Sequence, residues 1–86
     1  MASETKIGTV THYFGKIQVA AIELTHGALA VGETIRIKGH TSDFTQTVHS
    51  MQIDRVEIPK AEQGQAIGIR LNEHARVGDE VFKVSE

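Results

Sequence analysis

The stretch that decides the fold is "AVGETIRIKG" at residues 30–39, and a shorter form of it returns as "RVGDEVFKV" at residues 76–84. In the first copy isoleucines alternate with polar residues, so an extended chain would have one apolar and one wet face. Gly32 and Gly78 each follow a valine and precede an acid. A glycine there takes positive φ at no cost, and the acid accepts backbone N–H groups. The phrase predicts a tight turn that leads into a β-strand, used twice.

The same two-residue alternation of apolar and polar side chains recurs along most of the chain, whereas helical spacing is almost absent. Two of the segments change the parity of their apolar positions, which predicts a bulge or a bend in each. We predict an all-β fold, a small closed antiparallel β-barrel of about six to seven strands. The expected strands are 7–14, 16–24, 34–38, 45–53, 55–58, 65–71 and 80–84.

Eighty-six residues with 40% hydrophobic composition predict one small domain. We assign residues 1–6 to a flexible N-terminus, 7–84 to the barrel and 85–86 to the C-terminal end. There is no cysteine, and no apolar run approaches the ~18 residues of a membrane span. The sequence therefore predicts a soluble, cytoplasmic protein without a membrane segment. A net charge of -2 argues against a strongly basic nucleic-acid binder.

Catalytic and metal-binding patterns are weak. The five histidines lack His-x-His or His-x-x-x-His spacing, so a metal site would have to assemble from separate loops. Ser42, His40 and Asp43 are too close in one turn to align as nucleophile, base and acid, and a self-capping polar loop is the simpler interpretation. Glu33 and Asp79 as a catalytic carboxylate pair are likewise less favoured than their turn role. We expect no catalytic residue, no metal and no cofactor.

Binding is the better hypothesis for this sequence. Arg36 and Lys38 stand on the outer face of the "TIRIKG" strand, His40 starts the next loop, and Phe44 offers an aromatic ring on which a base could stack. Arg70 lies on a similar wet face. We predict these five as binding residues. The alternative is a set of ordinary solvated charges beside a core phenylalanine.

The chain resembles the second domain of translational GTPases, the β-barrel of the elongation factor Tu type. The matching phrases are "HGALAVGETIRIKG", "TVHSMQI" and "AEQGQAIGIRL", in this order over residues 7–84. No Gly-x-x-x-x-Gly-Lys-(Ser/Thr) loop is present, so no nucleotide is expected to bind. Ala20 and Ala21 stand where the family commonly has a Gly-Arg pair. The "THYFGKIQVAAIEL" start is closer to the free-standing elongation-factor-like proteins and to the similar barrel at the C-terminus of U32 peptidases.

The resemblance implies a non-catalytic module that binds ribosomal RNA, transfer RNA, the ribosome or a translation partner protein. The alternative is an adaptor that docks by protein contacts alone onto a separate enzyme, such as a U32-type peptidase, with no nucleic-acid role. The two differ in their salt dependence, because counterion release makes RNA binding weaken steeply with salt.

Overall fold

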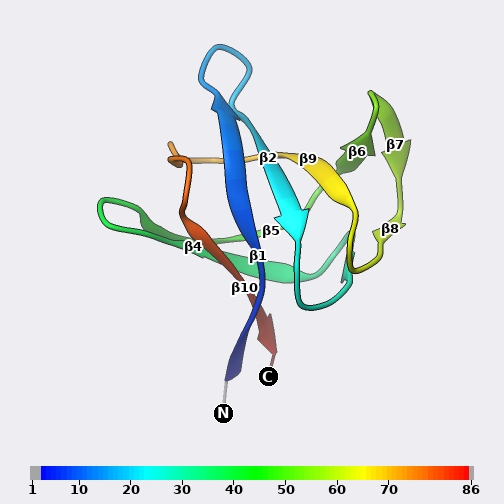
Figure 1. Cartoon of the computed structure of the whole chain (residues 1–86), viewed down its shortest axis with the longest axis horizontal. Coiled ribbons are helices and arrows are strands. Elements are labelled where there is room, and N and C mark those ends of the chain that lie inside the picture. The colour runs from blue at the N-terminus through cyan, green and yellow to red at the C-terminus, as the bar shows by residue number, and fades with distance from the viewer. Residues whose placement is uncertain (1–2, 86) are drawn as a thin grey trace.

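The computed structural model describes residues 3–85 and contains ten strands but no helix among them. Eight strands form one antiparallel sheet in the order β5-β4-β10-β1-β2-β9-β6-β7, and β3 pairs with β8 in a separate two-stranded sheet (Figure 1). The strands are β1 (Ser3–Phe14), β2 (Val19–Leu24), β3 (Leu29–Ala30), β4 (Thr34–Lys38), β5 (Asp43–Thr47), β6 (Met51–Ile53), β7 (Val56–Ile58), β8 (Lys60–Ala61), β9 (Ala66–Arg70) and β10 (Glu80–Ser85). The predicted all-β fold is confirmed.

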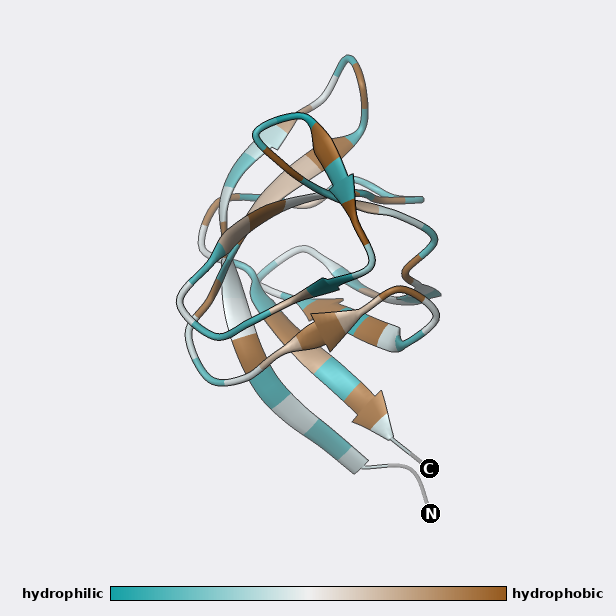
Figure 2. Cartoon of the chain, turned by 90° about the vertical axis from the view of Figure 1, so that its right-hand side faces the viewer, coloured by the Kyte–Doolittle hydropathy of each residue, from teal (hydrophilic) through white to brown (hydrophobic). Residues whose placement is uncertain are grey.

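The apolar side of the curled sheet forms the core. Figure 2 shows hydrophobic and hydrophilic residues alternating along several strands, as expected when one face of each strand is buried. In β4, Ile35 and Ile37 are fully buried, while Thr34, Arg36 and Lys38 on either side of them are not. In β9, Ile67 and Ile69 repeat this pattern. Fully buried side chains from the other strands complete the core, and they include Val10, Ile22, Leu24, Leu29, Met51 and Val81.

One turn design occurs three times, at residues 30–33, 62–65 and 76–79. The third residue of each is a glycine with positive φ, at 96°, 94° and 94°. The fourth residue donates its N–H to the carbonyl of the first, and its side chain accepts the N–H of the first. The side-chain contacts are Ala30 N to Glu33 Oε1 at 2.7 Å, Glu62 N to Gln65 Oε1 at 2.7 Å and Arg76 N to Asp79 Oδ2 at 3.0 Å. The predicted turn role of Gly32 and Gly78 is confirmed, and "EQGQ" is a third copy.

Of the predicted bulge or bend in each of the two segments, a bulge is not what the structure shows, because the ladders of β2 with β9, β4 with β5 and β6 with β9 have no register shift. The expected strand 45–53 is two strands, because Val48 leaves the ladder to exchange backbone hydrogen bonds with Gly32 and Glu33. The expected strand 16–24 begins only at Val19, and Ile17 lies in the preceding turn, 60% exposed. From Val19 onward, burial alternates regularly through β2.

Backbone hydrogen bonds do not close the sheet. Its end strands are β5 and β7, and no ladder joins these two within residues 3–85. A side chain spans part of the gap: the buried amide of Gln46 donates to the carbonyl of Arg70 at 3.1 Å and accepts the N–H of Asn72 at 2.7 Å. Closure into a barrel is therefore not confirmed.

The two ends of the described chain pair with each other. Ser3 of β1 lies opposite Ser85 of β10, so residues 3–6 of the predicted flexible terminus are part of a strand. Residues 1–2 and 86 of the predicted terminal segments lie outside the described residues. The assignment of 7–84 to a single domain stays a prediction.

Candidate functional site

A β-bulge in β1 sets the surface of the candidate site. The register between β1 and β2 skips Thr11, so side chains beyond it change face. Val10 is fully buried before the bulge, and Tyr13 packs against the core after it. His12 and Phe14 consequently face outward, with their ring centroids 4.3 Å apart. The bulge thus places two aromatic rings on the outer face of the sheet.

Small residues lie on the same outer face next to these rings. Ala21 of β2 pairs with Gly68 of β9, which in turn pairs with Gln52 of β6. A Cβ built on Gly68 would come within 3.4 Å of Val19 Cγ1, in ordinary contact. Glycine inside a strand is typical of a place where another chain or ligand approaches the backbone closely. The outer surface of the sheet is therefore recessed at Gly68, where no side chain covers the backbone.

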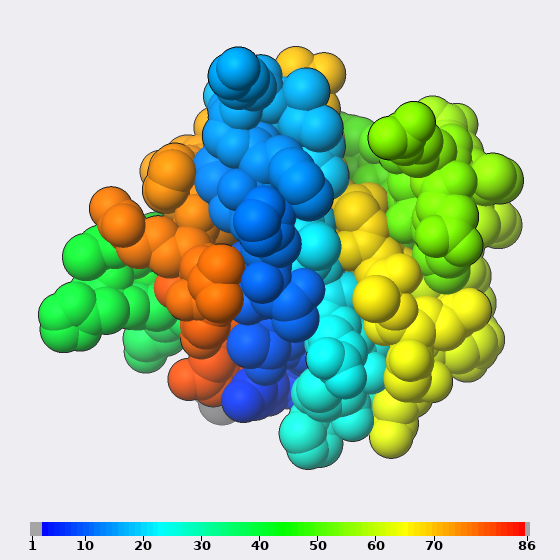
Figure 3. Space-filling model, turned by 45° about the horizontal axis from the view of Figure 1, so that its top comes forward, coloured from blue at the N-terminus to red at the C-terminus, as the bar shows by residue number. Residues whose placement is uncertain are grey.

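A hairpin flanks this recessed part of the sheet on each side, and together they form a groove with a volume of about 390 Å³. In Figure 3, β9 (yellow) lies between the β1–β2 hairpin (blue to cyan) and the β6–β7 hairpin (green). The lining includes Ile17 and Val19 from the first hairpin, Gln52 and Glu57 from the second, and Gly68 and Arg70 from β9. We call this the hairpin groove.

The connections of both hairpins carry exposed apolar side chains and unusual backbone. Ile17 is 60% exposed and Val56 is 64% exposed. Gln18, Asp54 and Arg55 have φ of 58°, 51° and 67°, and they are the non-glycine residues of the described chain with positive φ. Such conformations cost of order 1–3 kcal/mol each and cluster at functional sites. The hairpin connections are thus less optimised for stability than the rest of the fold.

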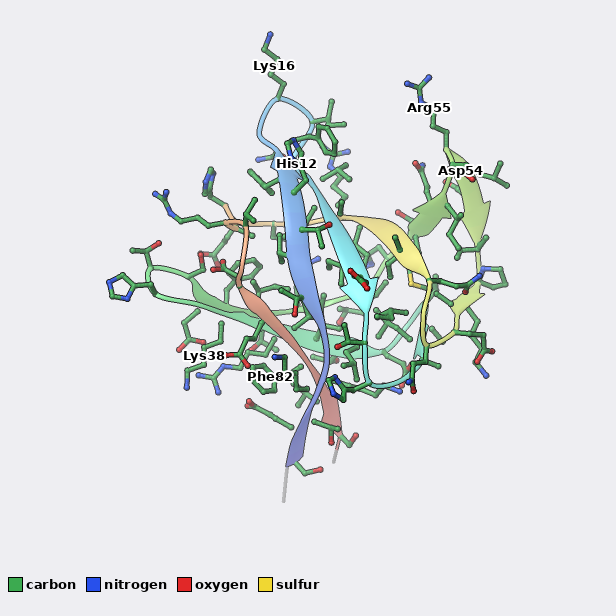
Figure 4. The ribbon with its side chains drawn as sticks, viewed as in Figure 1. His12, Lys16, Lys38, Asp54, Arg55 and Phe82 are labelled. Carbon is green, nitrogen blue, oxygen red and sulfur yellow. The ribbon has the colours of Figure 1, made fainter. Side chains whose placement is uncertain are left out.

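Five cations of the described chain have no ion-pair partner, and three of them lie in the groove region, the other two being Lys38 and Arg76. Within residues 3–85, no carboxylate oxygen lies within 4.0 Å of the charged nitrogens of Lys16, Arg55 or Arg70. Lys16 and Arg55 project from the two hairpin tips, away from the body of the molecule (Figure 4). Glu57 is the carboxylate among the groove residues, on the β7 side. An anionic ligand in the groove would therefore meet Arg70 beside Glu57, with Lys16 and Arg55 on the hairpin tips around it.

Arg36 has the opposite environment. Its Nε and Nη2 donate to Asp43, each at 2.8 Å, and its Nη1 donates to Glu4 at 2.9 and 3.1 Å. Hydrogen bonds to these two carboxylates raise the pKa of Arg36, and the same guanidinium holds the pKa of Asp43 below its usual value. The side chain of Arg36 is thus already engaged by the protein itself.

The structure does not bring the five predicted binding residues together. Lys38 and His40 are exposed around a second hollow that Val77 and Phe82 also line. Phe44 is only 8% exposed and pairs with Ile37 on the buried face, so a base has no access to its ring. Arg70 lies on β9, which β10, β1 and β2 separate from β4. The binding role of the exposed members stays a prediction.

Sequence reasoning missed the rest of the groove. The lack of a large side chain at Ala21 and the "AIGIR" glycine, Gly68, were visible signals, but pairing across three strands was needed to place them together. The predicted strand 16–24 places Ile17 inside a strand, whereas the residue lies exposed in the turn before β2.

The described residues provide little for catalysis or metal binding. They contain no group of three or more His, Cys, Asp or Glu side chains arranged to hold a metal ion. His26 Nδ1 lies 2.7 Å from Thr25 Oγ1, and the ring of His74 packs edge-on against Tyr13. Residues 3–85 also contain no helix that is long and apolar enough to cross a membrane.

Comparison with known proteins gives proteases as relatives. An uncharacterized protease of Methanocaldococcus jannaschii is 39% identical over 82 residues, which are 94% of this chain but 20% of that protein. A collagenase of Porphyromonas gingivalis is 31% identical over 81 residues, 93% of this chain and 22% of the collagenase. The chain thus spans about one fifth of the length of these curated relatives. No family model matches it.

Solved structures show the fold. The C-terminal domain of a putative U32 peptidase from Geobacillus thermoleovorans superimposes with a TM-score of 0.84 at 16% identity, covering 90% of this chain and 96% of that domain. A second structure of the same domain gives a TM-score of 0.83. The chain therefore has the fold of this C-terminal domain.

These findings correct the functional prediction from sequence. The relatives and the structural neighbours are proteases and a peptidase domain, so the assignment to translation, RNA binding and the ribosome is wrong. The sequence phrases that suggested it mark turns and strands, which proteins of different function can share. The peptidase alternative is the one that the comparisons support.

Proposed function

We propose that this chain is a non-catalytic module of a U32-type peptidase, one that makes protein contacts and leaves the chemistry to another part of the enzyme. The observation that carries the proposal is the extent of the matches. Nearly all of this chain aligns with about one fifth of a protease and with almost all of a separate C-terminal peptidase domain. The remaining four fifths of the protease would hold the catalytic machinery.

The geometry supports a contact role over a catalytic one. The lining of the hairpin groove is partly apolar and contains no histidine. A groove of this kind suits a polypeptide better than it suits the enclosed, precisely positioned polar groups that acid–base chemistry needs. One relative is named a collagenase, so the whole enzyme in this proposal acts on protein substrates.

Two further points belong to this proposal. The absence of cysteine fits a reducing compartment, which supports a cytoplasmic site of action. The Gln46 amide joins the β5 edge to the chain after β9, which supports a barrel closed by side-chain contacts where the ladder stops.

The proposal is tested with the chain and a truncated relative. The M. jannaschii protease is produced without its matching 82 residues, mixed with this chain, and analysed by gel filtration with light scattering. We expect a one-to-one complex, and separate elution at concentrations of about 50 μM would contradict the docking role, since such a complex would be weaker than most functional interfaces. The chain alone is incubated with gelatin. Hydrolysis that follows the chain through a second purification would contradict the non-catalytic role.

A further inference from the structure

We propose that the hairpin groove binds an extended polypeptide segment in which apolar side chains alternate with carboxylates. The inference rests on the proposed function in one respect, because it takes the partner of the module to be a protein. It assigns the contact surface, the conformation of the partner and its charge.

The shape of the groove suits an extended chain. Its floor includes the outer face of β9, where Gly68 leaves the backbone close to the surface, next to Ala21 of β2. Its sides are the two hairpins, and β9 lies between them (Figure 3). An extended strand presents side chains alternately to opposite sides, so one set would face the floor and the other would face outward. A helix, at about 10 Å across, is much wider than a single extended strand.

We expect apolar side chains in the partner because the β1–β2 hairpin presents an exposed apolar surface to the groove. Ile17 and Val19 line the groove, and Phe14 beside them is 47% exposed. Val19 lies opposite Phe14 across the β1–β2 ladder, so the three side chains form one apolar wall. Burying this wall gives about 25 cal/mol for each Å² of apolar surface removed from water. A partner without apolar side chains would lose this contribution.

We expect carboxylates in the partner because of the positive charges around the groove. Lys16, Arg55 and Arg70 come from the three elements that border the groove, and within residues 3–85 they have no carboxylate within ion-pair distance. Against these three charges stand Glu57 in the groove wall and Asp54 at the second tip. Arg70 lies in the groove itself and offers a planar fork to a carboxylate. The balance favours an acidic partner.

The second hollow is a poorer candidate for the same role. Asp79 and Glu80 line it together with Lys38, so its charges largely cancel. The Asp79 carboxylate is buried and already accepts the N–H of Arg76. Lys38 has no ion-pair partner within residues 3–85, but it is the one Lys or Arg among the residues that line this hollow, against two carboxylates.

The test is an NMR titration of the full ¹⁵N-labelled chain with two capped ten-residue peptides. In one peptide leucine alternates with aspartate, and in the other leucine alternates with lysine. We expect the amide signals of Gln52, Gly68 and Arg70 to shift with the first peptide, and we expect it to bind about tenfold more tightly than the second, a difference of about 1.4 kcal/mol. A ten-residue polyaspartate should bind more weakly than the alternating acidic peptide.

Two groove variants and one control sharpen the test. Arg70→Glu should reverse the preference between the two charged peptides, and Ile17→Ser should weaken both of them about equally. Lys38→Glu makes the same charge change outside the groove and should leave both affinities as they were. All three positions are on the surface, so the variants should keep the dispersed amide spectrum of the folded chain.

Equal binding of the two charged peptides would overturn the inference, and so would shifts confined to the surface around Lys38 and His40. Shifts of the groove signals on concentrating the chain alone would also overturn it, because they would indicate self-association. Failure of the proposed function looks different. In that case no complex forms with the truncated protease, whatever the peptides do. A complex that survives both Arg70→Glu and Ile17→Ser would support the proposed function but contradict the groove as its contact surface.

Discussion

Replacing Arg55 by glycine should make the protein more stable and its groove less attractive to an acidic partner. Asp54 and Arg55 are the two central residues of the turn between β6 and β7, and both have positive φ. This conformation is that of a type I′ turn, in which Asp-Gly is among the most favoured pairs. The natural arginine is therefore a poor choice for the backbone, and we infer that it is present for its charge.

The expected gain in stability follows from two opposing effects. A non-glycine residue in the left-handed region costs about 1–2 kcal/mol. Glycine loses more backbone entropy on folding than other residues do, which reduces this gain in stability by about 0.5–1 kcal/mol. The variant should therefore be more stable by about 0.5–1 kcal/mol, and for a domain of this size 1 kcal/mol corresponds to a rise in Tm of about 4–8 °C.

Thermal and urea unfolding of Arg55→Gly measure this gain, and the alternating acidic peptide measures the loss of binding. Lys16→Gly is the matched control. It also removes a cation from a hairpin tip, but Lys16 does not have positive φ, so its Tm should stay the same or fall. A Tm of Arg55→Gly at or below that of the parent would refute the argument from backbone strain. If the affinity for the acidic peptide is unchanged, Arg55 is not part of the binding surface.

Three other predictions concern the fold. Gln46→Leu should lower the free energy of unfolding by about 2–6 kcal/mol in urea titrations, since it leaves two backbone groups without their partner and each costs about 1–3 kcal/mol. Gly39→Ala should cost about 1–3 kcal/mol, because its Cβ would overlap Oδ1 of Asp79, and the cost should largely disappear in an Asp79→Ala background. The pKa of Asp43, measured by ¹³C NMR, should lie below its usual value and return to it in Arg36→Gln.

Each of these has an outcome that would contradict it. A loss below about 0.5 kcal/mol for Gln46→Leu would mean that water replaces the amide and that side-chain closure is unimportant. If the effects of Gly39→Ala and Asp79→Ala on the free energy of unfolding simply add, the strain in Gly39→Ala does not come from a contact with Asp79. Because the pKa of Asp43 is lowered in the folded state, its ion pair stabilises the protein above the ordinary carboxyl pKa, and this is lost as the pH falls through the folded value. Acid unfolding that is the same in Arg36→Gln would contradict that link.

The turns and the buried faces of the strands were predictable from sequence because their causes are local. Gly32 and Gly78 need positive φ, and the alternating isoleucines of β4 and β9 need a buried face, whatever surrounds them. The Thr11 bulge was not predictable, because it depends on the register that β1 shares with β2. Function was mistaken for a similar reason: the phrases that resembled a translation factor encode turns and strands, and these do not specify a ligand.

The sequence alone determined that the chain is all-β, where most strands lie and which of their faces is buried, since a period of two and a glycine turn are properties of neighbouring residues. Only the tertiary structure decided the candidate site. Ile17, Gly68 and Arg70 come from distant parts of the chain and meet because β9 pairs with β2. It also decided that Arg36 is engaged by Asp43 and Glu4 whereas Arg70 is not. Charges of the same kind thus acquire different roles, because the availability of a cation depends on which carboxylates the fold places beside it.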